Sequence, residues 1–135
     1  MPTGKRSQVF EWLLRIIAAI IMLQTLYFKF TGHPQSVALF TKLGMEPWGR
    51  ISIGVLELVA SLLIVYPRTT GWGSLLGVGL MSGALFFHLT KLGIEVDGDP
   101  VLFIYALITF FCCLVLLIIY RNQILKHLPL GTTRG

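Results

Sequence analysis

The chain has 135 residues, of which 55% are hydrophobic and only 13% are charged, and its mean hydropathy is +0.79. Soluble globular domains carry roughly 25% charged residues because their surfaces face water. The composition therefore excludes an ordinary soluble domain and predicts one integral membrane domain over residues 1–135. The net charge of +5 does not indicate nucleic-acid binding, because the basic residues stand at the ends of apolar runs and form no basic stripe.

The first apolar segment covers residues 10–30 and contains Arg15, Gln24 and Lys29. Lys5 and Arg6 precede it, as basic residues precede the apolar part of a secretory signal peptide. The segment is longer than that part of a signal peptide, and no A-x-A-like cleavage site follows it. We therefore expect a retained transmembrane helix.

Three further apolar segments follow at residues 51–66, 71–90 and 101–120. Each is near the roughly 20 residues that cross a hydrocarbon core of about 30 Å. Helices are required there because lipid offers the backbone no hydrogen-bond partners. The second segment is short, and we expect Trp48 and Gly49 to extend it at the interface. The sequence thus predicts an all-α fold, an integral membrane four-helix bundle.

Two further patterns concern packing and anchoring. Four glycines of the third segment form two pairs at a spacing of four residues, which predicts close helix contacts on two faces: Gly73, Gly77, Gly79 and Gly83. Five aromatic residues lie near predicted interfaces, as in an aromatic belt: Tyr27, Trp48, Tyr66, Trp72 and Tyr120. The adjacent Cys112 and Cys113 form no CxxC motif and are expected to pack in the core.

The basic residues also predict the orientation. Four spans place both termini and the loop at Arg68 on one side, and most Lys and Arg residues lie there. Arg15 and Lys91 are expected to anchor the boundaries. The acidic loop of residues 95–100 lies on the other side. The bias predicts that both termini are cytoplasmic and that the chain lies in a cell inner or plasma membrane.

Ionisable residues inside the apolar segments are the candidates for function, because a charge at mid-bilayer costs at least about 2.5–3.5 kcal/mol and needs a partner. Lys29, Glu57 and His88 meet this criterion. Counting along alternating helices places all three in the outer half of the membrane, with Glu57 about 9 Å below the boundary at 1.5 Å per residue. Tyr105 and Gln24 reach a similar depth.

Each candidate also has a structural interpretation. Glu57 either pairs with Lys29 to lock two helices together or serves as a proton or cation relay or a ligand-binding group. Lys29 alone is more often a snorkelling anchor, and His88 alone a hydrogen-bonded structural histidine. One His and one Glu do not make a metal site, so none is expected. No nucleophile-base arrangement or cofactor-binding motif is evident in the sequence.

Four short stretches resemble, in order and spacing, the motifs of the DoxX-like family of small four-helix membrane proteins: KFTG (29–32), FTKLGME (40–46), GVLEL (54–58) and ALFFHL (84–89). The resemblance covers residues 15–120 and implies a four-helix membrane bundle. The family is associated with quinone-linked redox and assembly complexes, so the resemblance implies a bound quinone as the cofactor class. One departure is residues 24–27, QTLY, where the family commonly has glycines.

Three functions remain open. The first is an accessory subunit of a membrane redox system, handling a quinone or protons near Lys29, Glu57 and His88. The second is a non-catalytic assembly partner of a membrane complex, and the third is a small-molecule or ion carrier. The missing cofactor motifs favour an accessory subunit over a complete enzyme. The expected partners are the lipid bilayer and other membrane subunits or further copies of the chain, with no nucleic acid.

Overall fold

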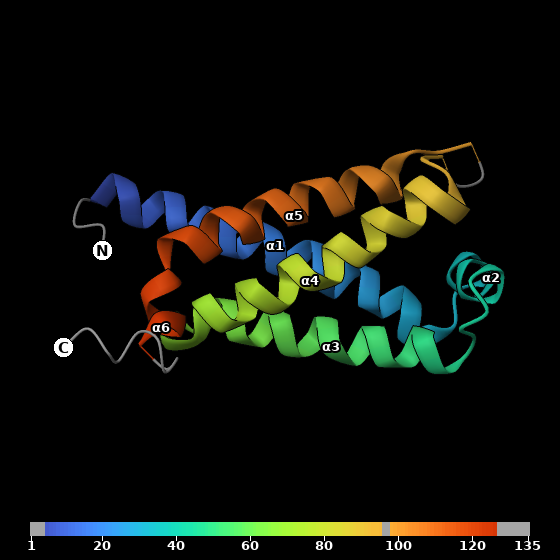
Figure 1. Cartoon of the computed structure of the whole chain (residues 1–135), viewed down its shortest axis with the longest axis horizontal. Helices are drawn as coiled ribbons and strands as arrows, with labels where there is room; N and C mark the ends of the chain where they lie inside the picture. The colour runs from blue at the N-terminus through green and yellow to red at the C-terminus, as the bar shows by residue number, and fades with distance from the viewer. Residues whose placement is uncertain (1–4, 96–97, 127–135) are drawn as a thin grey trace.

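The computed structural model describes residues 5–95 and 98–126, and every regular element in these ranges is helical. The elements, in chain order (Figure 1), are α1 (Lys5–Thr31), α2 (Pro34–Lys42), α3 (Trp48–Val65), the short η1 (Pro67–Thr69), α4 (Thr70–Phe87), the π-helical turn η2 (His88–Leu92), α5 (Val101–Ile119) and α6 (Arg121–Leu125).

Four stretches are long and apolar enough to cross a membrane: Gln8–Thr31, Trp48–Val65, Pro67–Leu92 and Val101–Ile119. The predicted four-helix membrane bundle is therefore confirmed. As expected, Trp48 and Gly49 extend the second span. The third span is longer than predicted, because η2 continues the helical path of α4 to Leu92.

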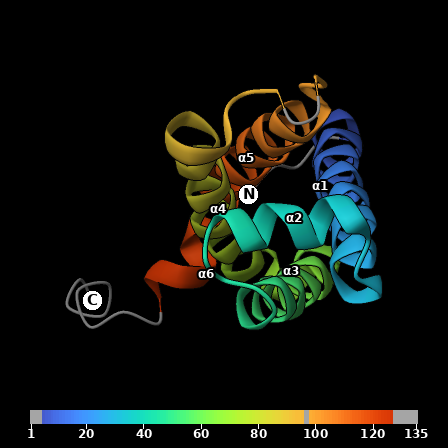
Figure 2. The same cartoon turned by 90° about the vertical axis from the view of Figure 1, so that its right-hand side faces the viewer.

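The four long helices form a ring in which α1 and α4 each pack against both α3 and α5. One end of the bundle, which we call the terminal end, holds the end of α5 and α6 (Figure 1). The opposite end, the α2 end, is crossed by α2, which lies over the mouth of the ring (Figure 2). The bundle is thus closed differently at its two ends.

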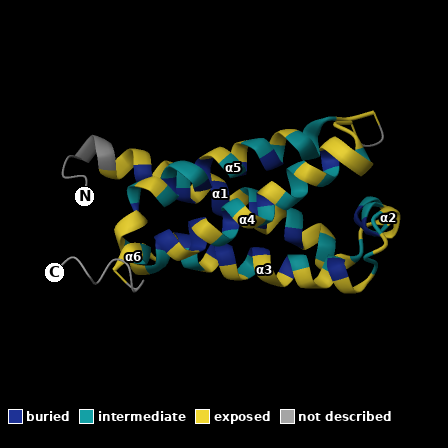
Figure 3. Ribbon diagram, viewed as in Figure 1, coloured by how far each residue is buried: buried dark blue, intermediate teal, exposed yellow. Residues whose placement is uncertain are grey.

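The surface of the ring is apolar, as a lipid-facing surface must be. Exposed and buried residues alternate along each long helix (Figure 3), and the exposed ones include large apolar side chains. Leu62 and Phe111 are each 58% exposed. Soluble monomers rarely expose so much contiguous apolar surface to water, whereas a surface in contact with lipid is expected to be apolar. The exposed faces therefore mark where the bilayer contacts the bundle.

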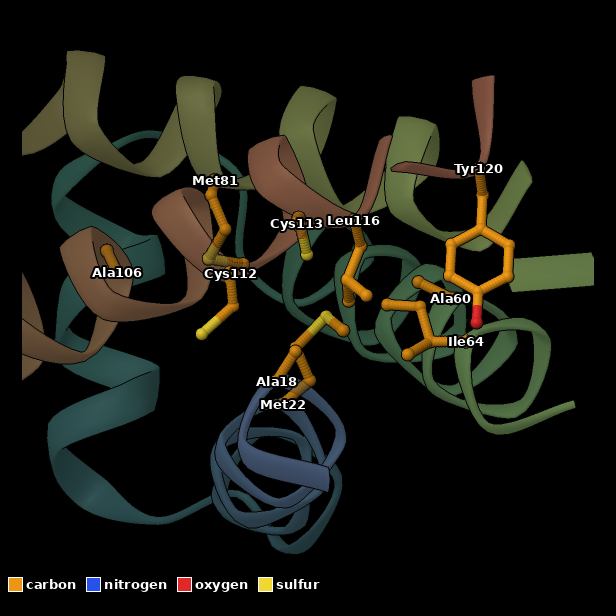
Figure 4. Close-up of a cluster of buried hydrophobic side chains, with 10 residues drawn as sticks. All are labelled: Ala18, Met22, Ala60, Ile64, Met81, Ala106, Cys112, Cys113, Leu116 and Tyr120. Carbon is orange, nitrogen blue, oxygen red and sulfur yellow. The ribbon is translucent and has the colours of Figure 1, made fainter. Parts of the chain in front are cut away.

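The core runs along the inside of the ring, from Tyr120 at the terminal end to Met81 and Ala106. Its buried side chains come from all four long helices (Figure 4) and include Met22, Ile64, Met81 and Leu116. Cys112 and Cys113 are both free and buried in this core, in agreement with the prediction of apolar packing. Close packing of these side chains holds the helices together, because lipid supplies no hydrophobic driving force between them.

The two glycine pairs of α4 behave differently. A Cβ added to Gly73 would lie 2.7 Å from the backbone nitrogen of Ile64, and one added to Gly77 would lie 2.5 Å from Cys113 Sγ. These two glycines allow the close approach that was predicted. A Cβ on Gly79 or Gly83 would meet no atom within 4 Å. The prediction of a second close face was therefore wrong, because no helix packs against these two positions.

Two boundary residues also differ from expectation. Arg15 was predicted to anchor the boundary, yet it is only 2% exposed. Its guanidinium donates hydrogen bonds to the carbonyl oxygens of Ile64 at 3.0 Å and of Val65 at 2.5 Å, and stacks over Trp12. Arg15 thus satisfies carbonyls that the end of α3 leaves without intrahelical partners. Tyr120, predicted in the aromatic belt, is buried.

Candidate functional site

The ion pair between α1 and α3 is the first element of the site. Lys29 Nζ lies 3.1 Å from Glu57 Oε1. Thr25, one turn before Lys29 on α1, places its hydroxyl 3.4 Å from Glu57 Oε2. The i, i+4 spacing puts Thr25 and Lys29 on one face of the helix, so both side chains reach the same carboxylate.

Glu57 lies near the middle of α3. It is nine residues after Trp48, the first residue of the helix, and therefore about 13.5 Å along it at 1.5 Å per residue. Lys29 remains near the end of α1, and its long side chain reaches inward to the carboxylate. A charged pair at this depth contacts the bundle interior and not lipid.

His88 is held by a different set of contacts. It is buried at the first position of η2, where its Nδ1 lies 2.9 Å from the carbonyl oxygen of Gly93. Its ring also meets Phe103 of α5 edge to face, with centroids 5.7 Å apart. A carbonyl oxygen only accepts, so Nδ1 carries the proton in this contact, and Nε2 is left for a second partner. π-helical turns are rare and occur frequently at functional sites.

A cavity of about 460 Å³ brings these groups together. Its wall is mostly apolar and comes from the four long helices together with α2 and η2. All five residues proposed from the sequence line it: Gln24, Lys29, Glu57, His88 and Tyr105. Whether they bind a ligand or carry protons stays a prediction, but their proximity around one cavity is a feature of the structure.

The short helix α2, which the sequence analysis missed, forms the floor of this cavity at the α2 end. Pro34 stands in its first turn, and His33 caps it by accepting a hydrogen bond from the backbone N–H of Gln35 at 3.2 Å. Ser36 and Phe40 are the buried residues of α2, and both line the cavity. Two features of the sequence indicate this helix: Pro34 stands at a position that favours a helix start, and small and apolar residues follow it as far as Phe40.

The chemistry available in the cavity is that of a polar patch on an apolar wall. Lys29 offers N–H donors, Tyr105 offers a hydroxyl, and His88 offers the second nitrogen of its ring, Nε2. Glu57 accepts as a carboxylate and donates when protonated. Such an arrangement suits a largely apolar molecule with a few polar oxygen atoms. Among the described residues, no group of three or more His, Cys, Asp or Glu side chains is placed to hold a metal ion.

A second buried polar cluster lies at the terminal end, away from the cavity. Tyr120 Oη donates a hydrogen bond of 2.6 Å to Glu11 Oε1, and Arg15 lies one turn after Glu11 on α1. The sequence analysis overlooked Glu11, although its spacing from Arg15 was a signal. Because this cluster joins the ends of α1, α3 and α5, it closes the bundle at the terminal end.

A model of the DoxX-like family matches residues 13–117. The match includes all five residues proposed from the sequence and runs from the first turns of α1 almost to the end of α5. No curated protein and no solved structure matches the chain significantly. The match covers well over half of the sequence, and the chain belongs to the DoxX-like family.

Proposed function

We propose that this protein is an accessory subunit of a membrane redox system and that its cavity binds a quinone. The observation that carries the proposal is one cavity of about 460 Å³ inside a membrane-spanning bundle, with a mostly apolar wall and polar side chains that include the five residues predicted from the sequence. Ligand pockets of roughly 300–1,000 Å³ hold small molecules largely buried. A quinone ring is apolar apart from its carbonyl oxygens, which accept hydrogen bonds.

The polar residues divide the task between binding and proton handling. Lys29 and Tyr105 line the cavity with donors for a carbonyl oxygen. Reduction of a quinone to a quinol takes up two electrons and two protons. The electrons come from a partner subunit, and His88 and Glu57 are two of the titratable groups that line the cavity and can pass the protons. This chain then positions the quinone for its partner.

The proposal also includes the orientation, with both termini in the cytoplasm and the α2 end outside. The excess of Lys and Arg on the side of the termini supports it. Glu95→Cys at the α2 end is expected to react with an impermeant maleimide added to intact cells, whereas Arg68→Cys is not. The parent chain is the control, because its own two cysteines are buried. Reaction of Arg68→Cys alone would reverse the orientation.

Binding is tested with the purified protein in lipid nanodiscs, titrated with decylubiquinone. Glu57→Gln and His88→Gln keep size and hydrogen-bonding capacity but remove titration. We expect each to weaken binding by about tenfold, equivalent to about 1.4 kcal/mol, because each leaves a polar partner imperfectly matched. The matched control is Glu11→Gln, which alters a buried carboxylate at the opposite end of the bundle and should leave binding unchanged.

A parent protein that does not bind the quinone contradicts the proposal, as do Glu57→Gln and His88→Gln variants that bind it as tightly as the parent. The second candidate function is a non-catalytic assembly partner. It is favoured by the Lys29–Glu57 pair, which joins α1 to α3 and so has a sufficient structural role. That candidate predicts a partner complex of normal stability when Glu57 is replaced by Gln.

A further inference from the structure

The two halves of the bundle are packed differently. In the terminal half, α4 touches α3 so closely that a Cβ on Gly73 would lie 2.9 Å from the carbonyl oxygen of Ala60. Nearer the α2 end, Gly79 and Gly83 have no atom within 4 Å of such a Cβ. The ribbons of α3 and α4 correspondingly separate toward the α2 end (Figure 1).

At the α2 end, the helices remain joined as two pairs. α1 stays with α3 through Lys29–Glu57 and through Phe30, whose ring would lie 2.6 Å from a Cβ on Gly54. α4 and η2 stay with α5 through the contact of His88 with Phe103. The cavity lies between the two pairs, since residues of all four helices line it.

The separation of α3 and α4 opens the cavity to the side. Gly79 and Gly83 both line the cavity, and Gly79 is exposed, as are Gln24, Phe28 and His33 among the other lining residues. Together with the separation of α3 and α4, the exposure of Gly79 indicates an opening beside this residue. Ile53 of α3 lines the cavity opposite. We call the opening bounded by Ile53, Gly79 and Gly83 the α3–α4 window.

The window faces lipid rather than water. Gly79 lies at the middle of the span Pro67–Leu92, where the acyl chains of a bilayer surround the bundle. The approach along the bundle axis is crossed by α2, whose Ser36 and Phe40 are buried and line the cavity (Figure 2). A molecule dissolved in the bilayer therefore reaches the cavity without passing its apolar parts through water.

We propose that the cavity takes an amphiphile with an apolar chain, whose head lies beside Lys29, Glu57 and His88 while its chain passes through the α3–α4 window into the bilayer. This inference rests on the proposed function of the cavity and adds the class of ligand and the route of its chain. The head alone has to fit within about 460 Å³. Gly79 and Gly83, which lie one turn apart on α4 and have no side chains, leave the room that the chain needs.

The experiment compares two probes, decylubiquinone and the chainless ubiquinone head group, in nanodiscs. Gly79→Phe places a ring in the window and not beside the polar residues. The matched control is Ser82→Phe, which adds the same ring to an exposed position of α4 that does not line the cavity. We expect Gly79→Phe to weaken decylubiquinone binding by about tenfold, as overfilling a fitted space does, and to leave the head group almost unaffected.

Gly83→Phe is the second variant, in case Gly79→Phe does not fold. Equal affinities of the parent and both window variants for decylubiquinone would overturn the inference, as would an equal loss for both probes. In either case binding of the head group by the parent leaves the proposed function standing. If the parent binds neither probe, the proposed function fails and the inference fails with it. If Ser82→Phe weakens decylubiquinone binding as much as Gly79→Phe does, the proposed route of the chain through the α3–α4 window is also contradicted.

Discussion

The Lys29–Glu57 pair predicts a specific pattern of stability losses. The two side chains are only 15% and 4% exposed, and their charged atoms lie 3.1 Å apart. Removing one partner of a well-buried pair costs about 3–5 kcal/mol because a charge is left without compensation. Lys29→Met should cost more than Glu57→Leu, since it leaves a carboxylate near mid-span. The lysine left by Glu57→Leu lies near the end of α1, where its long side chain can extend to the interface.

The double variant Lys29→Met/Glu57→Leu leaves no charge behind, so we expect it to be more stable than Lys29→Met alone. Unfolding in mixed micelles with increasing denaturing detergent, followed by circular dichroism, measures all four proteins. The expected coupling energy is at least about 2 kcal/mol, well above the 0.3–0.5 kcal/mol scatter of independent sites. Additive losses would refute the reasoning and show that the two charges are solvated separately.

Three further predictions use the same unfolding measurement. Gly73→Ala should destabilise by about 1–3 kcal/mol because its Cβ meets backbone atoms, whereas Gly79→Ala should stabilise by about 0.4–1 kcal/mol through reduced chain entropy; equal effects would contradict the packing difference. Arg15→Ala should cost about 1.5–3 kcal/mol through lost charged hydrogen bonds, and an unchanged midpoint would count against them. The hydrogen bond from Arg50 lowers the pKa of Glu46 below its ordinary value of 4.5. The advantage of the parent over Glu46→Gln should therefore be full above pH 4.5 and be lost as the pH falls from there through the lowered pKa; a pH-independent difference would disprove this.

The spans could be predicted because the bilayer itself fixes their length and requires helices. The ends were less predictable, since interfacial residues belong to a helix without being strongly apolar. The extension of α3 by Trp48 and Gly49 was predicted, whereas the continuation of the third span through η2 to Leu92 was not. The neighbourhood of Lys29 and Glu57 was predictable from depth counting, because charges within lipid need partners. The contacts of His88 with Gly93 and Phe103 were not, since they depend on the π-helical turn.

Contacts that join distant parts of the chain left little signal in the sequence. The hydrogen bond between Glu11 and Tyr120 spans 109 residues, and nothing local to either residue requires it. Tyrosine is a residue type that is common at membrane interfaces, yet the side chain of Tyr120 is buried. The lining of the cavity by Ser36 and Phe40 was hidden for a similar reason, because a nine-residue helix is too short for hydropathy to identify as part of a membrane bundle.

The different packing of the two halves explains how so short a chain can be both stable and hollow. Gly73 and Gly77 let three helices approach at the terminal half, and Arg15 fixes the end of α3 there. That half supplies the dispersion contacts and hydrogen bonds that hold a bundle together in lipid. The helices can then diverge toward the α2 end while the terminal half keeps their relative positions fixed. The same glycine spacing has opposite consequences in the two halves. Where helices converge it permits contact, and where they diverge, at Gly79, it leaves a gap that lipid or a ligand chain must fill.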